Sequence, residues 1–117
     1  MGSRMARVNE QLKEVLAVLV DELTDPRVGF VTITGVETAP DLSRAEVWYT
    51  QLEDTPEARQ ATAEGLDSAV PMLRSELGRR VRLRRVPALD FRHDPAPGEG
   101  RHIEALLEQA RDRDDER

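Results

Sequence analysis

The chain has 117 residues, a formal net charge of −6, 38% hydrophobic and 34% charged residues, and no cysteine. A chain of this length typically forms one domain that buries roughly two-thirds of its unfolded surface. The lack of cysteine excludes disulfides and thiolate metal sites. No apolar run approaches the roughly 20 residues of a membrane span, so we expect a cytoplasmic protein.

Apolar residues recur at helical spacing along the first part of the chain. The spacing i, i+4, i+7, i+8, i+11, i+12 and i+15 places them on one stripe, which predicts an amphipathic helix. The sequence Thr-Asp-Pro-Arg at 24–27 should end this helix, because the residue before a proline disfavours the α region. The stripe consists of Val8, Leu12, Val15, Leu16, Leu19, Val20 and Leu23.

Two segments with the composition of β-strands follow. Residues 29–37 are rich in β-branched side chains, and residues 44–53 alternate between apolar and polar positions. The cluster Thr-Ala-Pro-Asp-Leu-Ser at 38–43 between them is typical of a turn. This arrangement predicts an antiparallel hairpin.

A second helix is predicted from residue 54 to residue 70. Asp54 or Thr55 can cap it, and Pro56 suits its first turn. Pro71 should bend or interrupt the helix, because proline removes a backbone hydrogen bond and clashes with the preceding turn. Beyond it, residues 71–80 continue the helix. The predicted buried positions are mostly small before the proline and larger after it: Ala58, Ala61, Thr62, Gly65, Leu66, Ala69, Met72, Leu73 and Leu77.

The remaining segments predict a third strand, a loop and a short helix. Residues 81–91 form the strand, with Arg82 and Arg84 on the face opposite Val81 and Leu83. Pro87 should place this strand at a sheet edge or in a bulge. Residues 95–100 form the loop, residues 101–111 the helix, and residues 109–117 a charged tail.

Charge is segregated along the chain. Residues 37–67 contain eight acids and two arginines, whereas residues 73–94 contain seven arginines and three acids. Arginine suits bidentate contacts with phosphate and stacking on unpaired bases, so these seven are candidate RNA-binding residues. The alternative is that they pair with the acids of 37–67 on a solvated face. The seven are Arg74, Arg79, Arg80, Arg82, Arg84, Arg85 and Arg92.

Three stretches of the chain resemble the ribosome-binding factor A family of bacterial small-subunit assembly factors. They are "DPRVGFVTITGVETAPDLSRAEVWYT" at 25–50, "LRSELGRRVRLRRVPALDFRHD" at 73–94 and "IEALL" at 103–107. The resemblance implies an α+β fold of the KH-like type II class over residues 1–108, with a mixed three-stranded sheet and helices on one face.

The same resemblance implies a function. It implies binding to 16S ribosomal RNA and to the immature small (30S) subunit near the 5′ end of that RNA. It also implies a role in late subunit maturation and 16S processing, with support of growth in the cold. No cofactor, small-molecule substrate or membrane partner is expected, and a monomer is the default expectation.

One departure concerns the bend in the second helix. The family carries an Ala-x-Gly kink there, and the matching residues of this chain are Ala69, Val70 and Pro71. Proline and glycine both break helices, so we expect the kink to persist. The chain contains no Gly-x-x-Gly loop, which classical KH domains use to hold a nucleic-acid backbone. The N-terminal Arg4, Arg7 and Lys13 are possible secondary RNA contacts.

Two alternatives to RNA binding stay open. In the first, the chain is a protein-interaction module that uses a strand edge, and the arginines meet an acidic partner. In the second, it is a subunit of an RNA-modifying enzyme. The sequence has no phosphate-binding loop, Gly-x-Ser-x-Gly or His-Glu-x-x-His motif. We therefore expect no catalytic residue and no metal site. Trp48 should pack against a strand or the final helix, although stacking on a base is the alternative.

Overall fold

The computed structural model describes residues 3–94 of the chain. The elements follow in the order α1 (Ser3–Asp21), β1 (Val31–Thr38), β2 (Arg44–Gln51), α2 (Pro56–Arg80) and β3 (Ala88–His93). The loop at 95–100, the helix at 101–111 and the tail at 109–117 that the sequence predicts lie outside the described residues.

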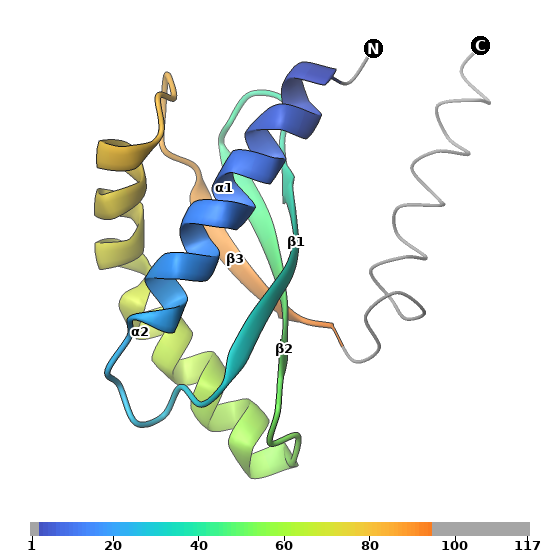
Figure 1. Cartoon of the computed structure of the whole chain (residues 1–117), viewed down its shortest axis with the longest axis vertical. Coiled ribbons are helices and arrows are strands. Elements are labelled where there is room, and N and C mark those ends of the chain that lie inside the picture. The colour runs from blue at the N-terminus through green and yellow to red at the C-terminus, as the bar shows by residue number, and fades with distance from the viewer. Residues whose placement is uncertain (1–2, 95–117) are drawn as a thin grey trace, which may run out of the picture.

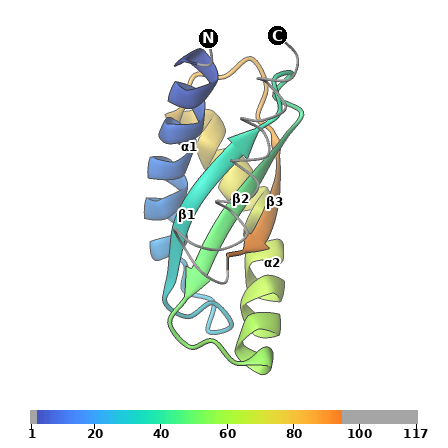
Figure 2. The same cartoon turned by 90° about the vertical axis from the view of Figure 1, so that its right-hand side faces the viewer.

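The sheet is mixed, as expected. Its strand order is β1-β2-β3, with β1 antiparallel to β2 and β2 parallel to β3. Both helices cover the same face of this sheet (Figures 1 and 2). The expected α+β architecture is therefore confirmed, and β3 occupies the sheet edge that Pro87 had suggested.

A β-bulge interrupts the regular alternation of side chains along β1. Ile33 pairs with Tyr49 and Gly35 with Trp48, so Thr34 is the extra residue on β1. The extra residue shifts the alternation by one position, and Ile33 and Val36 therefore both enter the core. The Thr34 hydroxyl donates a hydrogen bond of 3.0 Å to Oδ2 of the buried Asp94, just beyond β3.

The helices supply most of the fully buried side chains. The predicted stripe of α1 is confirmed, because its central members are buried and the others pack against the core. In α2 the prediction that Met72 points inward is wrong, since this side chain is 44% exposed. Leu73 and Leu77 are one helical turn apart and fill the core instead. The largest fully buried aliphatic side chains of the helices are Leu12, Leu16, Leu66, Leu73 and Leu77.

The start and the middle of α2 follow the sequence signals. Thr55 is the N-cap, its side chain accepts a hydrogen bond of 3.1 Å from the Ala58 N–H, and Pro56 begins the helix. The helix is continuous through Pro71, and its axis changes direction between its green and yellow turns (Figure 1). The proline therefore bends the helix without ending it.

The predicted strand at 81–91 is wrong in its first half. Residues 82–87 form a loop, and β3 begins only at Ala88. In the parallel register Ala88 pairs with Arg44, the first residue of β2. Residues before Ala88 would lie beyond the start of β2, where the chain belongs to the β1–β2 turn and offers no strand to pair with. Arg82 and Arg84 therefore lie on a loop and not on a sheet face.

The Trp48 side chain is buried, with 5% of its surface exposed. This agrees with the packing expectation. The alternative, an exposed ring on which a base stacks, is wrong.

A close approach between α2 and the α1–β1 connection depends on Gly65. This residue is buried, and a Cβ atom built on it would lie 2.5 Å from Cγ2 of Val28 and 3.2 Å from Cβ of Arg27. The missing side chain allows the connection to pack directly on the helix.

We expect Gly65→Ala to destabilise the fold. Overpacking costs about 1–3 kcal/mol, and the better helix propensity of alanine offsets about 1 kcal/mol of it. Urea unfolding should therefore show a lower midpoint. Val28→Ala introduced with Gly65→Ala should cost less than the sum of the two single changes, because it removes the clashing methyl group. A Gly65→Ala protein as stable as the unchanged chain would contradict this packing.

Candidate nucleic-acid interface

The seven candidate arginines divide into two groups by what their guanidinium groups contact. Four of them bind acceptors within the protein: Arg74, Arg79, Arg80 and Arg92. For the other three, the described residues provide no hydrogen bond or ion pair: Arg82, Arg84 and Arg85. The structure thus separates arginines that the sequence presents as one cluster.

Arg74 anchors the loop at residues 82–87, which carries Arg82, Arg84 and Arg85. Its Nη2 donates 2.8 Å to the carbonyl of Val86, and its Nε donates 3.0 Å to the carbonyl of Pro87. Pro87 has no N–H to add to the sheet, and it is fully buried. The bonds from Arg74 therefore join the end of the loop to α2 just before β3 begins.

The other engaged arginines are paired with carboxylates. On the last turns of α2, Arg79 and Arg80 lie 3.4 Å and 3.3 Å from Glu76. On β3, Arg92 lies 2.8 Å from Asp90 and 3.4 Å from Glu46 of the neighbouring strand. Pairs as exposed as these contribute little to stability, at most about 1 kcal/mol each. They do, however, reduce the positive charge available to a ligand.

A pocket of about 390 Å³ brings two of the unpaired arginines together with one from the N-terminus. Arg82 and Arg84 line it from the loop, and Arg4 lines it from α1. Arg7 and Lys13, the other possible secondary contacts, do not line it. None of Ala69, Val70 and Pro71 lines it either. Its remaining lining residues are Met5, Val8, Pro40, Leu42 and Leu83.

The β1–β2 turn forms one wall of this pocket through a residue in an unusual conformation. Leu42 has a φ of 62°, and its side chain is buried. Left-handed backbone at a non-glycine residue costs of order 1–3 kcal/mol and persists only where the surroundings impose it. The Leu42 N–H donates 2.8 Å to the Ala39 carbonyl, which closes the turn.

Hydrogen bonds fix the three walls of the pocket relative to one another. Oδ1 of Asn9 on α1 accepts a 2.9 Å bond from the N–H of Thr38 at the end of β1. The carbonyl of Ser43 in the turn accepts a 3.0 Å bond from the N–H of Ala88, where the loop ends. These two bonds connect α1 and the end of the loop to opposite ends of the β1–β2 turn.

The loop at residues 82–87, which we call the arginine loop, lies next to the β1–β2 turn. The electrostatics of that turn favour a charged aspartate. Hydrogen bonds from the side chain and the backbone of Ser43 lower the pKa of the Asp41 carboxyl, and the positive charge of Arg85 adds to this shift. Arg85 does not line the pocket, which leaves Arg82 and Arg84 as the loop arginines that do.

The turn residues of this site are not predicted from the sequence. Pro40 and Leu42 were assigned only a turn role, because composition identifies a turn without showing what its side chains contact. Met5 and Val8 lie just before or at the start of the predicted helix. The one available signal is Leu42, the only large aliphatic side chain in the turn cluster at 38–43.

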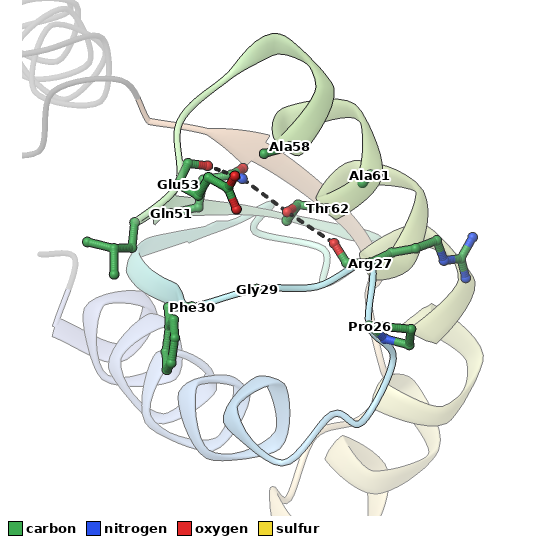
Figure 3. Close-up of a pocket in the computed structure, with 10 residues that line it drawn as sticks. Pro26, Arg27, Gly29, Phe30, Gln51, Glu53, Ala58, Ala61 and Thr62 are labelled. Carbon is green, nitrogen blue, oxygen red and sulfur yellow. Dashed lines mark hydrogen bonds between the residues drawn. The ribbon is translucent and has the colours of Figure 1, made fainter.

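A second pocket, of about 460 Å³, lies between the α1–β1 connection, the end of β2 and the start of α2 (Figure 3). Nε2 of Gln51 donates 3.1 Å to the hydroxyl of Thr62, which donates 3.4 Å to the carbonyl of Arg27. These bonds join the connection to both β2 and α2. Phe30 and Leu52 form its outer edge and are 81% and 80% exposed.

The two pockets lie toward opposite ends of the longest axis of the molecule. The N-terminus of α1 and the loop after α2 are at one end, and the connection between β2 and α2 is at the other (Figure 1). Among residues 3–94, no helix is both long and apolar enough to cross a membrane. The same residues contain no group of three or more histidine, aspartate or glutamate side chains that could hold a metal ion.

Comparisons of the chain with known proteins all lead to the same family. The family model described as ribosome-binding factor A matches residues 4–107. A protein of that name from Thioalkalivibrio sulfidiphilus is 47% identical over 109 residues, which cover 92% of this chain and 84% of that protein. Another from Beutenbergia cavernae is 41% identical over 116 residues, covering 98% of this chain and 72% of that protein.

Solved structures agree with this match. The crystal structure of ribosome-binding factor A from Thermus thermophilus superimposes with a TM-score of 0.69 at 32% identity, covering 75% of this chain and 92% of that chain. A homology model of the Thermus thermophilus factor, fitted into a cryo-EM map of its 30S complex, gives a TM-score of 0.60 at 33% identity. It covers 72% of this chain and 88% of that chain.

We expect Arg74→Met to destabilise the protein more than Arg79→Met. The Arg74→Met substitution removes two hydrogen bonds to backbone carbonyls, and we expect it to lower the free energy of unfolding by about 1–2 kcal/mol. Arg79 is 78% exposed and should change stability by less than about 0.5 kcal/mol. Urea unfolding measures both, and amide exchange at Ala88 should accelerate only in Arg74→Met. Equal effects of the two substitutions would contradict an anchoring role for Arg74.

Proposed function

Because the chain belongs to the ribosome-binding factor A family, we propose that it binds the small ribosomal subunit and assists its late maturation. In this proposal it docks on the immature subunit, contacts 16S ribosomal RNA in its 5′ region and favours one conformation of that RNA during processing. It acts as a cytoplasmic monomer and supports assembly in the cold.

The observation that carries the proposal is the unpaired arginine loop. Arg82, Arg84 and Arg85 have no hydrogen-bond or ion-pair partner among the described residues, and Arg4 lies beside two of them. A guanidinium without a carboxylate partner is available to phosphate, and phosphate contacts dominate the affinity of proteins for nucleic acids. An overall acidic chain can thus present a basic surface at one end.

The homology model of a family member that was fitted into a map of a 30S complex supports this proposal. It covers 72% of this chain at 33% identity. The partner of that protein is therefore the first partner to test for this one.

We propose that binding is the whole activity and that no reaction is catalysed. Arginine stays protonated at physiological pH, so it neither accepts a proton nor acts as a nucleophile. It positions and neutralises phosphate, which is what an assembly factor needs in order to stabilise one RNA conformation.

A second candidate function is a contact with a partner protein. The exposed pair Phe30 and Leu52 favours it, because two large apolar side chains at one site are typical of interaction surfaces. The N–H of Leu52 donates 3.0 Å to the carbonyl of Phe30, so the two residues are neighbours. This pair lies at the end of the molecule opposite the arginine loop.

We expect the double substitution Arg82→Ala and Arg84→Ala to weaken association with small subunits at least tenfold at moderate salt. Each lost phosphate contact should reduce the slope of log affinity against log salt by about 0.7, so the pair should reduce it by about 1.4. Co-sedimentation of mature and immature subunits on gradients at low and moderate salt measures both effects.

Arg79→Ala with Arg92→Ala is the matched control. It removes the same charge from arginines that already pair with Glu76 and Asp90, so its effect should be clearly smaller. An equal loss in the control would assign the effect to net charge and not to the loop. If the unchanged protein associates with neither form of the subunit, the proposal is wrong and the protein-contact candidate takes its place.

A further inference from the structure

We infer that the pocket between α1, the β1–β2 turn and the arginine loop holds one unpaired nucleotide of RNA. The base would lie on the apolar floor formed by Met5, Leu42 and Leu83, and the flanking phosphates would meet Arg82 and Arg84. This inference rests on the proposed function and adds to it a specific binding site and the class of ligand.

The lining of the pocket combines apolar surface with positive charge, and a nucleotide can bind to both. Its apolar members offer carbon and thioether surface to the face of a base, and sulfur–aromatic contacts are favourable. Its three guanidinium groups offer charge to phosphate and planar surfaces for stacking. Among residues 3–94, no carboxylate lines the pocket to compete for those groups.

The size of the pocket favours a single residue of RNA. Its volume of about 390 Å³ is at the lower end of the range of about 300–1000 Å³ that is usual for small-ligand sites. The bases of an A-form duplex are stacked and paired, so none of them can enter a pocket of this kind. A base that has left the stack can do so, and single-stranded loops are where proteins read RNA sequence.

Internal contacts hold the walls of the pocket in place. The left-handed Leu42 is held by the closed turn, Asn9 holds α1 against the end of β1, and Arg74 holds the end of the loop. Backbone strain that is maintained by surrounding contacts is found disproportionately at binding sites. A preformed floor would reduce the ordering cost of binding a flexible RNA segment.

The site is distinct from the helix bend. None of Ala69, Val70 and Pro71 lines the pocket, so the residues of the bend do not contribute to its surface. The pocket combines side chains from three segments that are far apart in sequence, namely Arg4–Val8, Pro40–Leu42 and Arg82–Arg84.

The test uses the full chain and a short single-stranded RNA that carries one 2-aminopurine, with the same strand in a complementary duplex for comparison. The fluorescence of 2-aminopurine reports a change in its stacking. We expect saturable binding to the single strand at least tenfold tighter than to the duplex. Leu83→Ser should weaken single-strand binding about tenfold without changing its salt slope, because it removes no charge.

Leu52→Ser is the matched control, since it makes the same chemical change at an exposed leucine outside the pocket. It should leave RNA binding unchanged. Leu42→Gly is a second variant that removes another part of the floor, and glycine adopts the left-handed conformation without strain. Thermal unfolding of each variant separates loss of the site from loss of the fold.

A readout without any substitution completes the test. The unchanged protein is irradiated with a single strand that contains 4-thiouridine, and the adducts are located by mass spectrometry. Adducts on peptides that contain Met5, Leu42 or Leu83 support the pocket. Equal affinity for single strand and duplex, or adducts only elsewhere, would overturn it, as would tighter binding of an acidic peptide that displaces the RNA.

Failure of this inference is distinguishable from failure of the proposed function. If small subunits still co-sediment with the protein while single-strand preference is absent, the arginines contact only phosphate and the nucleotide site is wrong. If the unchanged protein fails to associate with subunits, the proposed function is wrong whatever the oligonucleotides do.

Discussion

The parallel register between β2 and β3 determines where the positive charge of this protein lies. Ala88 pairs with Arg44 at the very start of β2, so the chain between the end of α2 and Ala88 has no strand to join. It forms a loop that projects beyond the sheet next to the β1–β2 turn. Arg74 bonds two carbonyls at the end of that loop. The loop therefore pairs with no strand among residues 3–94, and the bonds from Arg74 fix its end in position.

This geometry places the arginine loop at one end of the molecule. The β2–α2 connection, whose sequence contains Glu53 and Asp54, lies at one end of the long axis, and the loop between α2 and β3 lies at the other (Figure 1). Asp54 pairs with Arg59, with Nη2 3.0 Å from Oδ2, so part of the acidic charge is compensated locally. Net charge therefore says little about this molecule, because a ligand meets one end at a time.

Much of the architecture was predictable, because it depends on local signals. Helical spacing identified α1, alternation identified the hairpin, and Thr55 with Pro56 marked the start of α2. The predictions were wrong where a non-local contact overrode the pattern. Residues 81–84 alternate like a strand but have no pairing partner, and the bulge at Thr34 shifts the strand alternation in a way that composition does not reveal.

The sequence alone determined the order and type of the elements, the family resemblance and the arginine-rich segment, since all of these are properties of neighbouring residues. Only the tertiary structure decided which arginines have a hydrogen-bond or ion-pair partner among residues 3–94. That choice depends on carboxylates and carbonyls brought close by the fold, as Glu76 and Asp90 are to their partners. It also decided that Leu42 and Arg4 share a pocket with the loop, because their proximity follows from sheet register and helix packing and not from spacing along the chain.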